Sequence, residues 1–200
     1  MIKDRAKYLD PEIFYVEDIL EPEELKYLQD FCKNSGEWVS VLGLDNESLW
    51  NNNTKHVSDD RAALAIHKVN LAMAELVNSN IAVHHPHYNV NRYTPKSNPK
   101  VEGSTWWDDD EWSLNPHWDN AYGTLPEGTE MIYGVIFYIN DDYTGGEVSY
   151  TEKNMTFKPK PNTILVHSGK KEYIHGVKKV TSGERYTLAT FAFNPGSIYR

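Results

Sequence analysis

His117 and Asp119 are the residues whose types and spacing point most directly to chemistry, and they lie in the run His117-Trp118-Asp119. On an extended strand, side chains at positions i and i+2 point to the same side. The spacing therefore predicts an imidazole and a carboxylate on one face, with Trp118 on the other. Such a pair also occurs by chance, and the simpler alternative is a surface histidine beside an aspartate.

A second histidine, His175, follows Asp119 by 56 positions, within a predicted strand and directly before Gly176. Two histidines and one carboxylate can form a facial triad that leaves the other coordination positions of an iron(II) ion open. A structural zinc site would instead be closed by four protein ligands. His117, Asp119 and His175 are therefore the candidate metal ligands, and catalytic residues, of a centre that accepts external ligands.

Arg185 lies ten positions after His175, beyond the turn at Ser182-Gly183. We expect a hairpin of this size to bring Arg185 close to the metal face. A guanidinium fork suits a carboxylate ligand, and Thr187, on the same side of the predicted strand, is small enough to leave room for that ligand. The alternative is an ordinary edge arginine that pairs with a neighbouring acid.

The length of 200 residues favours one domain that covers residues 1–200. The net charge of −9 argues against a nucleic-acid-binding protein, although residues 156–200 carry a net charge of +6. No apolar run approaches the roughly 20 residues that a membrane helix needs, and the first residues lack the apolar stretch of a secretory signal. Cys32 is the single cysteine, so no disulfide can form within the chain, and we expect a cytoplasmic protein.

Two helices are predicted in the first 80 residues, and short strands after them. The first helix begins at Glu21-Pro22 and ends near Gly36. The second is capped by Ser58 and has a buried apolar stripe. The predicted strands span 81–93, 131–140, 147–151, 163–167, 173–180 and 185–193. This order indicates an α+β, mainly β fold: a jelly-roll core over about 81–194, with helical support over about 17–80 on its outer face.

Three further groups of residues each have a purely structural and a functional interpretation. The cluster His84-His85-Pro86-His87 could bind a metal, but Pro86 interrupts the strand and no fourth ligand is evident. Residues 94–116 resemble a loop that is either a substrate lid carrying Trp106, Trp107 and Trp112 or a solvent loop whose indoles pack on the body. The acidic run at 108–111 is expected to be solvated rather than a cation site.

A set of motifs resembles the iron(II)- and 2-oxoglutarate-dependent dioxygenases, in particular their prolyl 4-hydroxylase-like branch. The similarity is densest from about Val90 to Phe193. The motifs that carry it are His117-x-Asp119, Phe137-Tyr138-Ile139-Asn140-Asp141-Asp142 with Gly145-Gly146-Glu147, His175-Gly176-Val177, and Val180-x-x-Gly183-Glu184-Arg185-Tyr186. The resemblance implies a double-stranded β-helix, which is a flattened jelly roll.

The resemblance also implies roles for residues. His117, Asp119 and His175 would hold the iron, and Arg185 would bind the far carboxylate of 2-oxoglutarate. Tyr138 and Tyr93 match tyrosines whose hydroxyl groups can reach the cosubstrate, although strand tyrosines often simply pack. The implied cofactors are Fe(II), 2-oxoglutarate and O2, with ascorbate as the reductant.

The reaction implied by the resemblance is hydroxylation of a C–H bond, with release of succinate and CO2. Relatives that halogenate replace the carboxylate ligand, so the presence of Asp119 favours hydroxylation. A prolyl residue in a peptide or protein is the expected substrate, with no nucleic-acid or membrane partner, and the sequence indicates no oligomeric state.

The sequence departs from the family pattern at two positions, because Asn162 and His167 lie where family members often have Gly and Phe.

Two other classes of protein remain open at this point. A non-catalytic jelly-roll module could recognise a sugar or a partner protein through the Trp-rich segment. A cupin-like metalloenzyme could use a different metal without 2-oxoglutarate. The joint presence of His117, Asp119, His175 and Arg185 favours the dioxygenase, because a binding module does not need all four.

Overall fold

The computed structural model describes residues 2–34, 38–40, 53–56, 59–77, 89–97, 111–119 and 130–193. In chain order its elements are η1 (Ile2–Arg5), β1 (Lys7–Asp10), β2 (Ile13–Val16), α1 (Pro22–Asn34), β3 (Val39–Ser40), β4 (Asn53–His56), α2 (Asp60–Val77), β5 (Asn89–Tyr93), β6 (Trp112–His117), β7 (Met131–Tyr138), β8 (Thr144–Gly145), β9 (Val148–Tyr150), η3 (Thr151–Lys153), β10 (Met155–Phe157), β11 (Thr163–Ser168), η4 (Lys171–Tyr173), β12 (His175–Lys178), β13 (Val180–Ser182) and β14 (Arg185–Phe193).

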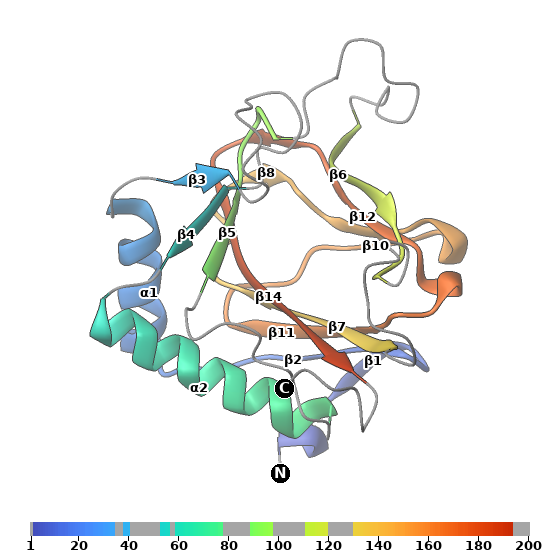
Figure 1. Cartoon of the computed structure of the whole chain (residues 1–200), viewed down its shortest axis with the longest axis horizontal. Coiled ribbons are helices and arrows are strands. Elements are labelled where there is room, and N and C mark those ends of the chain that lie inside the picture. Colours follow the sequence, from blue (N-terminus) through green and yellow to red (C-terminus); the bar gives the residue numbers. More distant parts are fainter. Residues whose placement is uncertain are drawn as a thin grey trace.

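The strands form a double-stranded β-helix built from two main antiparallel sheets (Figure 1). The large sheet has the order β1-β2-β11-β7-β14-β5-β4-β3, and the small sheet has the order β10-β9-β12-β6. A third pair, β13 and β8, completes the described strands. The mainly β fold with helices on the outer face, expected from the sequence, is therefore confirmed.

The large sheet separates two apolar layers. Alternate residues of its central strands, such as Ile164, Phe137 and Leu188, pack in one cluster with the buried stripe of α2 and with Leu28 of α1. Figure 1 shows both helices on the outer side of this sheet. Strand β11 is covered on both faces, and each of its residues is buried, including the polar Thr163, His167 and Ser168.

The opposite face of the large sheet looks into the space between the two sheets. Leu165 and Tyr138 from the large sheet pack there with Val148 and Tyr150 from the small sheet. Because side chains alternate along a strand, the same face receives His167 of β11, next but one to Leu165. The polar side chains that carry the candidate chemistry therefore lie inside the β-helix, away from the helices.

The helix starts follow from local capping chemistry. The α1 helix begins at Pro22, as predicted, with Glu23 and Glu24 in its first turn. The α2 helix is capped by Asp59, whose Oδ1 accepts from the Ala62 amide at 2.8 Å. The predicted cap at Ser58 was therefore wrong by one position, since a neighbouring carboxylate makes the capping bond. Ser58 itself and Gly36 lie outside the described residues.

Three expectations about strands need correction. Strands β1 and β2 precede the helices and join the large sheet. The predicted loop over 94–116 contains most of β6, and the proline at position 116 made this segment look like a loop in the sequence. Proline is tolerated there because β6 is an edge strand of the small sheet. The predicted hairpin from His175 to Arg185 is absent from the described residues, because β12 lies in the small sheet, β13 pairs with β8, and β14 lies in the large sheet.

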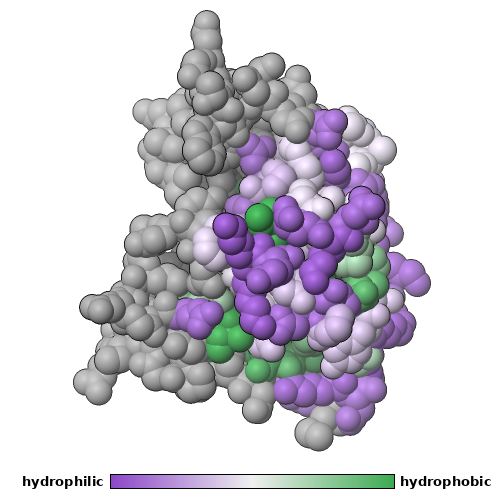
Figure 2. Space-filling model, turned by 90° about the vertical axis from the view of Figure 1, so that its right-hand side faces the viewer, coloured by the Kyte–Doolittle hydropathy of each residue, from purple (hydrophilic) through white to green (hydrophobic). Residues whose placement is uncertain are grey.

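The described surface is largely polar. Figure 2 shows one face of the molecule, on which hydrophilic residues predominate among the coloured atoms and hydrophobic ones form only small areas. Within the described helices there is no stretch with the length and apolar character that a bilayer crossing requires.

Candidate active site

The three predicted metal ligands converge at one end of the small sheet. His117 is the last residue of β6, His175 is the first residue of β12, and the two are paired across the strands. Asp119 follows His117 by two residues. Each side chain offers one ligand atom, and these atoms lie within 4.8 Å of one another. The sequence expected an extended strand through Asp119, whereas β6 ends at His117, and the two side chains still meet.

The two imidazoles are oriented by backbone carbonyl groups. His117 Nδ1 lies 2.8 Å from the Asn115 carbonyl oxygen, and His175 Nδ1 lies 3.0 Å from that of Tyr173. A carbonyl oxygen only accepts, so each Nδ1 carries the proton and donates it. Each Nε2 then presents its lone pair, 3.8 Å from Asp119 Oδ1. This tautomer is the one that a metal ligand needs.

Burial and neighbouring charge set the protonation of the cluster. Burial alone would raise the pKa of the Asp119 carboxyl, but the contact with His167 and the charges of the three surrounding imidazoles hold that pKa at about 2. Burial, with the neighbouring imidazoles, lowers the pKa of His175 well below its ordinary value. The site therefore presents an ionised carboxylate and a neutral imidazole at neutral pH, which are the forms that bind a metal ion.

His167 is a site residue that sequence reasoning noted only as a departure. Its ring is 1% exposed, its centroid lies 4.0 Å from that of His175, and its Nε2 lies 3.3 Å from Asp119 Oδ2. The signal that could have found it is the alternation of β11, which puts a histidine on the inner face next but one to Leu165.

Arg185 lies buried in a cradle of tyrosines. Its guanidinium carbon is 5.0 Å from the centroid of the Tyr93 ring and 4.9 Å from that of Tyr138. Tyr93 stands opposite Arg185 in the β5–β14 register. Tyr143, which the sequence analysis did not select, also faces the guanidinium, whose positive charge opposes the burial-driven rise in the Tyr143 pKa. In the described part of the chain no carboxylate lies within ion-pair distance of Arg185.

Three polar atoms of this cradle have no hydrogen-bond partner among the described residues. Arg185 Nε, the Tyr138 hydroxyl and the Tyr143 hydroxyl are buried without a hydrogen-bond partner among the described residues. Buried polar groups are normally satisfied, and an unpaired cation is costly to bury. Burial raises the pKa of Tyr138 to about 12, so its hydroxyl stays protonated and can donate. A carboxylate group fits this set of donors.

Thr187 is buried opposite Tyr138 in the β7–β14 register. It therefore lies on the same inner face as Arg185, as the two-residue spacing predicted. The metal-ligand candidates and the Arg185 cradle face the same space between the two sheets. Tyr138 of the cradle packs in one cluster with Tyr150, and Tyr150 contacts both His167 and His175.

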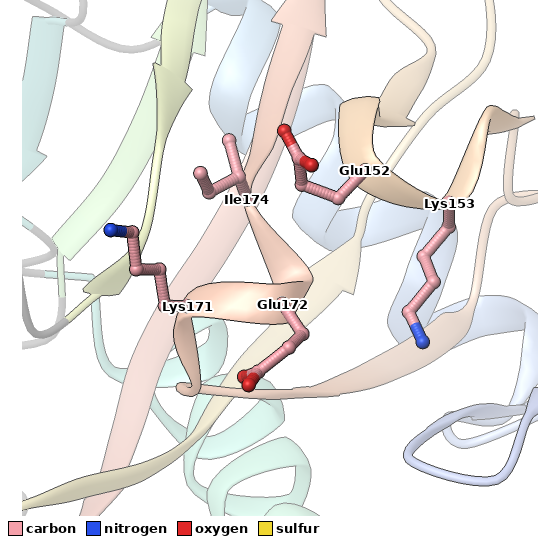
Figure 3. Close-up of a pocket in the computed structure, with 5 residues that line it drawn as sticks. All are labelled: Glu152, Lys153, Lys171, Glu172 and Ile174. Carbon is pink, nitrogen blue, oxygen red and sulfur yellow. The ribbon is translucent and has the colours of Figure 1, made fainter.

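The remaining predicted groups contribute less. Trp112 is buried in β6 beneath Lys178, whose Nζ lies 3.9 Å from the ring centroid, so this indole packs on the body. Glu111 pairs with Lys178. The cluster at 84–87, the run at 108–110, and Trp106 and Trp107 lie outside the described residues. An open depression of about 520 Å³ between η3 and η4 is lined by two acids, two amines and Ile174, and none of the metal-ligand candidates lines it (Figure 3).

A family model for the 2OG-Fe(II) oxygenase superfamily matches residues 108–193, the stretch that contains all three candidate ligands and Arg185. Residues 108–193 are thus similar to the domains of this superfamily. Prolyl 3-hydroxylase 2 of Homo sapiens is 36% identical to this chain over 92 residues, which are 44% of the chain and 13% of that protein. Prolyl 3-hydroxylase 3 of Homo sapiens is 32% identical over 81 residues, which are 38% of the chain and 11% of that protein. The chain thus spans only a small part of these relatives.

Solved structures confirm the double-stranded β-helix fold. The viral collagen prolyl hydroxylase of Paramecium Bursaria Chlorella virus-1, solved with 2OG, has a TM-score of 0.58 at 16% identity and covers 92% of this chain and 97% of its own. A prolyl hydroxylase of Trichoplax adhaerens, solved with a hypoxia inducible factor peptide, has a TM-score of 0.61 at 16% identity. The match covers 91% of this chain and 83% of the Trichoplax chain.

Proposed function

We propose that this chain is an iron(II)- and 2-oxoglutarate-dependent dioxygenase that hydroxylates a prolyl residue in a peptide or protein. The observation that carries the proposal is the convergence of the His117, Asp119 and His175 ligand atoms within 4.8 Å in the interior that also holds the unpaired Arg185 cradle. Two separate donor sets, one for a metal ion and one for a carboxylate, fit a cosubstrate that bridges them.

Bound iron and 2-oxoglutarate would supply the oxidising chemistry, with succinate and CO2 as products. The chain's own residues bind and orient. His117, Asp119 and His175 would hold the ion and leave positions for external ligands. Arg185, with the Tyr138 hydroxyl, takes the far carboxylate by charge-assisted hydrogen bonds. Tyr93 lies opposite Arg185 in the β5–β14 register, and Thr187 lies two residues further along β14, opposite Tyr138.

The prolyl substrate is supported by the names of the relatives, which are prolyl 3-hydroxylases by sequence and prolyl hydroxylases by structure, one of them with a bound peptide. The sequence relatives name position 3 of the proline ring and the two structural relatives name no position, so the position hydroxylated is a result of the assay. Ascorbate as the reductant and a cytoplasmic location remain predictions.

The test is turnover under defined conditions. The protein is incubated with Fe(II), ascorbate, 2-oxoglutarate and a panel of proline-containing peptides, and succinate and peptide mass are measured together. The proposal expects a mass gain of one oxygen atom on a prolyl residue, with an equal amount of succinate. His175→Ala should abolish both products because it removes a ligand.

Other outcomes separate the alternatives. Succinate without peptide oxidation would keep the oxygenase and remove the prolyl substrate. Metal-dependent turnover that does not need 2-oxoglutarate would favour a cupin-like enzyme. If an anaerobic titration with Fe(II) detects no metal binding, the result would favour a binding module.

A further inference from the structure

His167 links a buried tyrosine to the carboxylate ligand. The Tyr150 hydroxyl lies 2.9 Å from His167 Nδ1, and on the other side of the ring Nε2 lies 3.3 Å from Asp119 Oδ2. Oδ2 is buried and makes no hydrogen bond in the described structure. The 3.3 Å contact from His167 Nε2 is slightly longer than an ordinary hydrogen bond, so a small movement of either group completes the bond. The three groups form a line that begins in the core and ends at the metal cluster.

The chemistry of the two ends fixes the state of the ring. A carboxylate only accepts, so the nitrogen that faces Asp119 must carry a proton. In a neutral imidazole the other nitrogen, Nδ1, then has a lone pair, and the Tyr150 hydroxyl donates to it. Tyr150 therefore selects the tautomer in which His167 can donate to Asp119 Oδ2.

His167 is not in the group whose ligand atoms converge. That group consists of His117, Asp119 and His175, and both histidine Nε2 atoms face Asp119 Oδ1. His167 faces the other oxygen, Oδ2. Its place is thus behind the carboxylate, where it can hold one oxygen and leave the other to the metal.

The neighbouring strand makes room for this contact. Gly134 of β7 stands opposite His167 in the β7–β11 register. A Cβ atom at this position would lie 2.2 Å from His167 Nε2 and 2.7 Å from Asp119 Oδ2. Any side chain at residue 134 would therefore displace the imidazole or the carboxylate, so the close approach of the two groups depends on this glycine.

We propose that His167, held by Tyr150, is a positioning residue that fixes the Asp119 carboxylate with Oδ1 toward the metal and Oδ2 capped. The inference rests on the proposed function, because it assumes that the cluster binds a divalent metal ion. A phenylalanine at residue 167 would fill the same space against His175 but could not donate. The distinction between packing and hydrogen bonding is therefore open to direct test.

The experiment measures metal binding, not only turnover. Fe(II) is titrated anaerobically into the full chain and into His167→Phe, His167→Gln and Tyr150→Phe, and the visible charge-transfer band is recorded after 2-oxoglutarate is added. His67→Phe, the same exchange at an exposed position of α2, is the matched control. Circular dichroism confirms that each variant is folded.

Loss of a hydrogen bond to a metal ligand typically weakens metal binding by about 10- to 100-fold. His167→Phe should therefore raise the Fe(II) dissociation constant by at least about tenfold and alter the band. His167→Gln, whose amide can donate from near the Nε2 position, should recover most of the affinity. Tyr150→Phe should weaken binding by a few-fold, and His67→Phe should match the unsubstituted protein.

Equal Fe(II) affinity and an unchanged band in His167→Phe would overturn the positioning role and leave the proposed function intact. If His167→Phe does not fold, Tyr150→Phe is the deciding variant. An Fe(II) affinity of Tyr150→Phe equal to that of the unsubstituted protein would then overturn the positioning role. Failure of the unsubstituted chain to bind Fe(II) would instead remove the proposed function itself.

Discussion

Arg185 is a buried cation for which no carboxylate partner is found among the described residues. It is 2% exposed, three tyrosines surround it, and its Nε is unpaired. Hydrogen bonds to a charged group contribute about 1.5–3 kcal/mol. Arg185→Gln should thus weaken 2-oxoglutarate binding by roughly 10- to 100-fold while Fe(II) binding stays near normal. Anaerobic titration of the Fe(II)-loaded protein measures both constants.

The control for this variant is Arg61→Gln, which removes an exposed arginine from α2. It should leave the affinity for 2-oxoglutarate unchanged. An Arg185→Gln protein that binds 2-oxoglutarate as tightly as the control would contradict the assignment of the cradle.

Tyr143 gives a second test of the cradle. Its hydroxyl is buried and unpaired in the described structure, and its ring is fixed by Lys158, whose Nζ lies 4.3 Å from the centroid. Tyr143→Phe keeps the ring and removes one neutral donor, which is worth about 0.5–1.5 kcal/mol. We expect the 2-oxoglutarate dissociation constant to rise by roughly three- to tenfold. An unchanged constant would show that the hydroxyl does not reach the ligand.

At the level of single residues, the sequence predicted the metal-ligand candidates and Arg185. It did not predict the residues that contact them, such as His167 and Tyr143. The spacing of His117, Asp119 and His175 was sufficient to select the ligand candidates. Tyr143 could not be selected because it lies in a turn cluster, where spacing along a strand gives no direction. The two departures from the family pattern became meaningful only with the structure.

Asn162 illustrates such a departure. Its φ is 65°, a left-handed conformation that glycine adopts freely and asparagine tolerates better than most residues. Its side chain also bonds both backbone groups of Leu20, accepting from the amide and donating to the carbonyl, each at 2.8 Å. The asparagine thus meets the backbone requirement of a glycine and adds a tie between the N-terminal segment and β11.

Among the elements, α2 depends on a carboxylate cap. Asp59 accepts from the Ala62 amide at 2.8 Å and from the Tyr27 hydroxyl. These bonds lower its pKa below 3.8, the amide bond having the largest effect. Asp59→Ala should reduce the free energy of unfolding by about 1 kcal/mol at neutral pH, as measured by urea denaturation.

The pH dependence of this effect has a definite sign. A carboxyl whose folded pKa is below its unfolded pKa stabilises the fold above the unfolded value and loses that contribution as the pH falls through the folded value. The difference between wild type and Asp59→Ala should therefore be full above about pH 5 and shrink below 3.8. A difference that grows on acidification would contradict the capping role.

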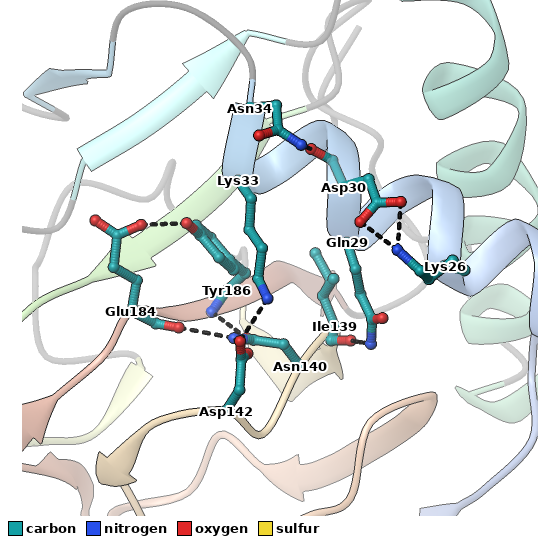
Figure 4. Close-up of polar contacts among 10 residues, drawn as sticks. All are labelled: Lys26, Gln29, Asp30, Lys33, Asn34, Ile139, Asn140, Asp142, Glu184 and Tyr186. Atoms are coloured by element: carbon teal, nitrogen blue, oxygen red, sulfur yellow. Dashed lines mark hydrogen bonds and ion pairs between the residues drawn. The ribbon is translucent and has the colours of Figure 1, made fainter.

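The junction of β7 and β14 is held by Asn140, which lies beside the strand that carries Arg185. Its Nδ2 donates to the Glu184 carbonyl and its Oδ1 accepts from the Tyr186 amide, both at 2.7 Å. Figure 4 shows this side chain between the two backbone groups, with Lys33 of α1 reaching the adjacent Asp142. Asn140 therefore fixes the backbone on both sides of Arg185.

Asn140→Ala should leave these buried backbone groups unpaired and reduce the free energy of unfolding by about 1–3 kcal/mol. It should also weaken 2-oxoglutarate binding by the folded protein, because Arg185 is less well held. Asn34→Ala, at the exposed end of α1, is the matched control and should change stability by less than about 0.5 kcal/mol. A stability loss with unchanged 2-oxoglutarate affinity would confine Asn140 to a structural role.

At the level of elements, periodicity predicted α1, α2 and the strands with strong apolar alternation. It failed where a long-range partner decides the structure. Strands β1 and β2 are four residues each. Strand β2 gains its order from pairing with β11, far along the chain, and β1 pairs with β2. The false hairpin has the same cause, since local spacing cannot reveal that β12 and β14 belong to different sheets.

Over the whole molecule, the two donor sets of the site belong to opposite walls of the β-helix. The metal-ligand candidates lie on β6, on β12 and just after β6, at the small sheet, whereas Arg185 lies on β14 of the large sheet. A metal ion alone would tie together only the end of the small sheet. A dicarboxylate that binds the ion and Arg185 would connect both sheets.

This arrangement predicts an ordered pattern of thermal stabilisation. A ligand that binds only the folded state adds about 2.7 kcal/mol when its concentration is 100 times its dissociation constant. We expect Fe(II) to raise the unfolding midpoint under anaerobic conditions, 2-oxoglutarate to raise it further only when Fe(II) is present, and a chelator to remove both increments. In Arg185→Gln the Fe(II) increment should remain and the 2-oxoglutarate increment should disappear, because the cosubstrate can then reach only one wall. A full 2-oxoglutarate increment without metal, or in the variant, would mean that the ligand does not span the two sheets.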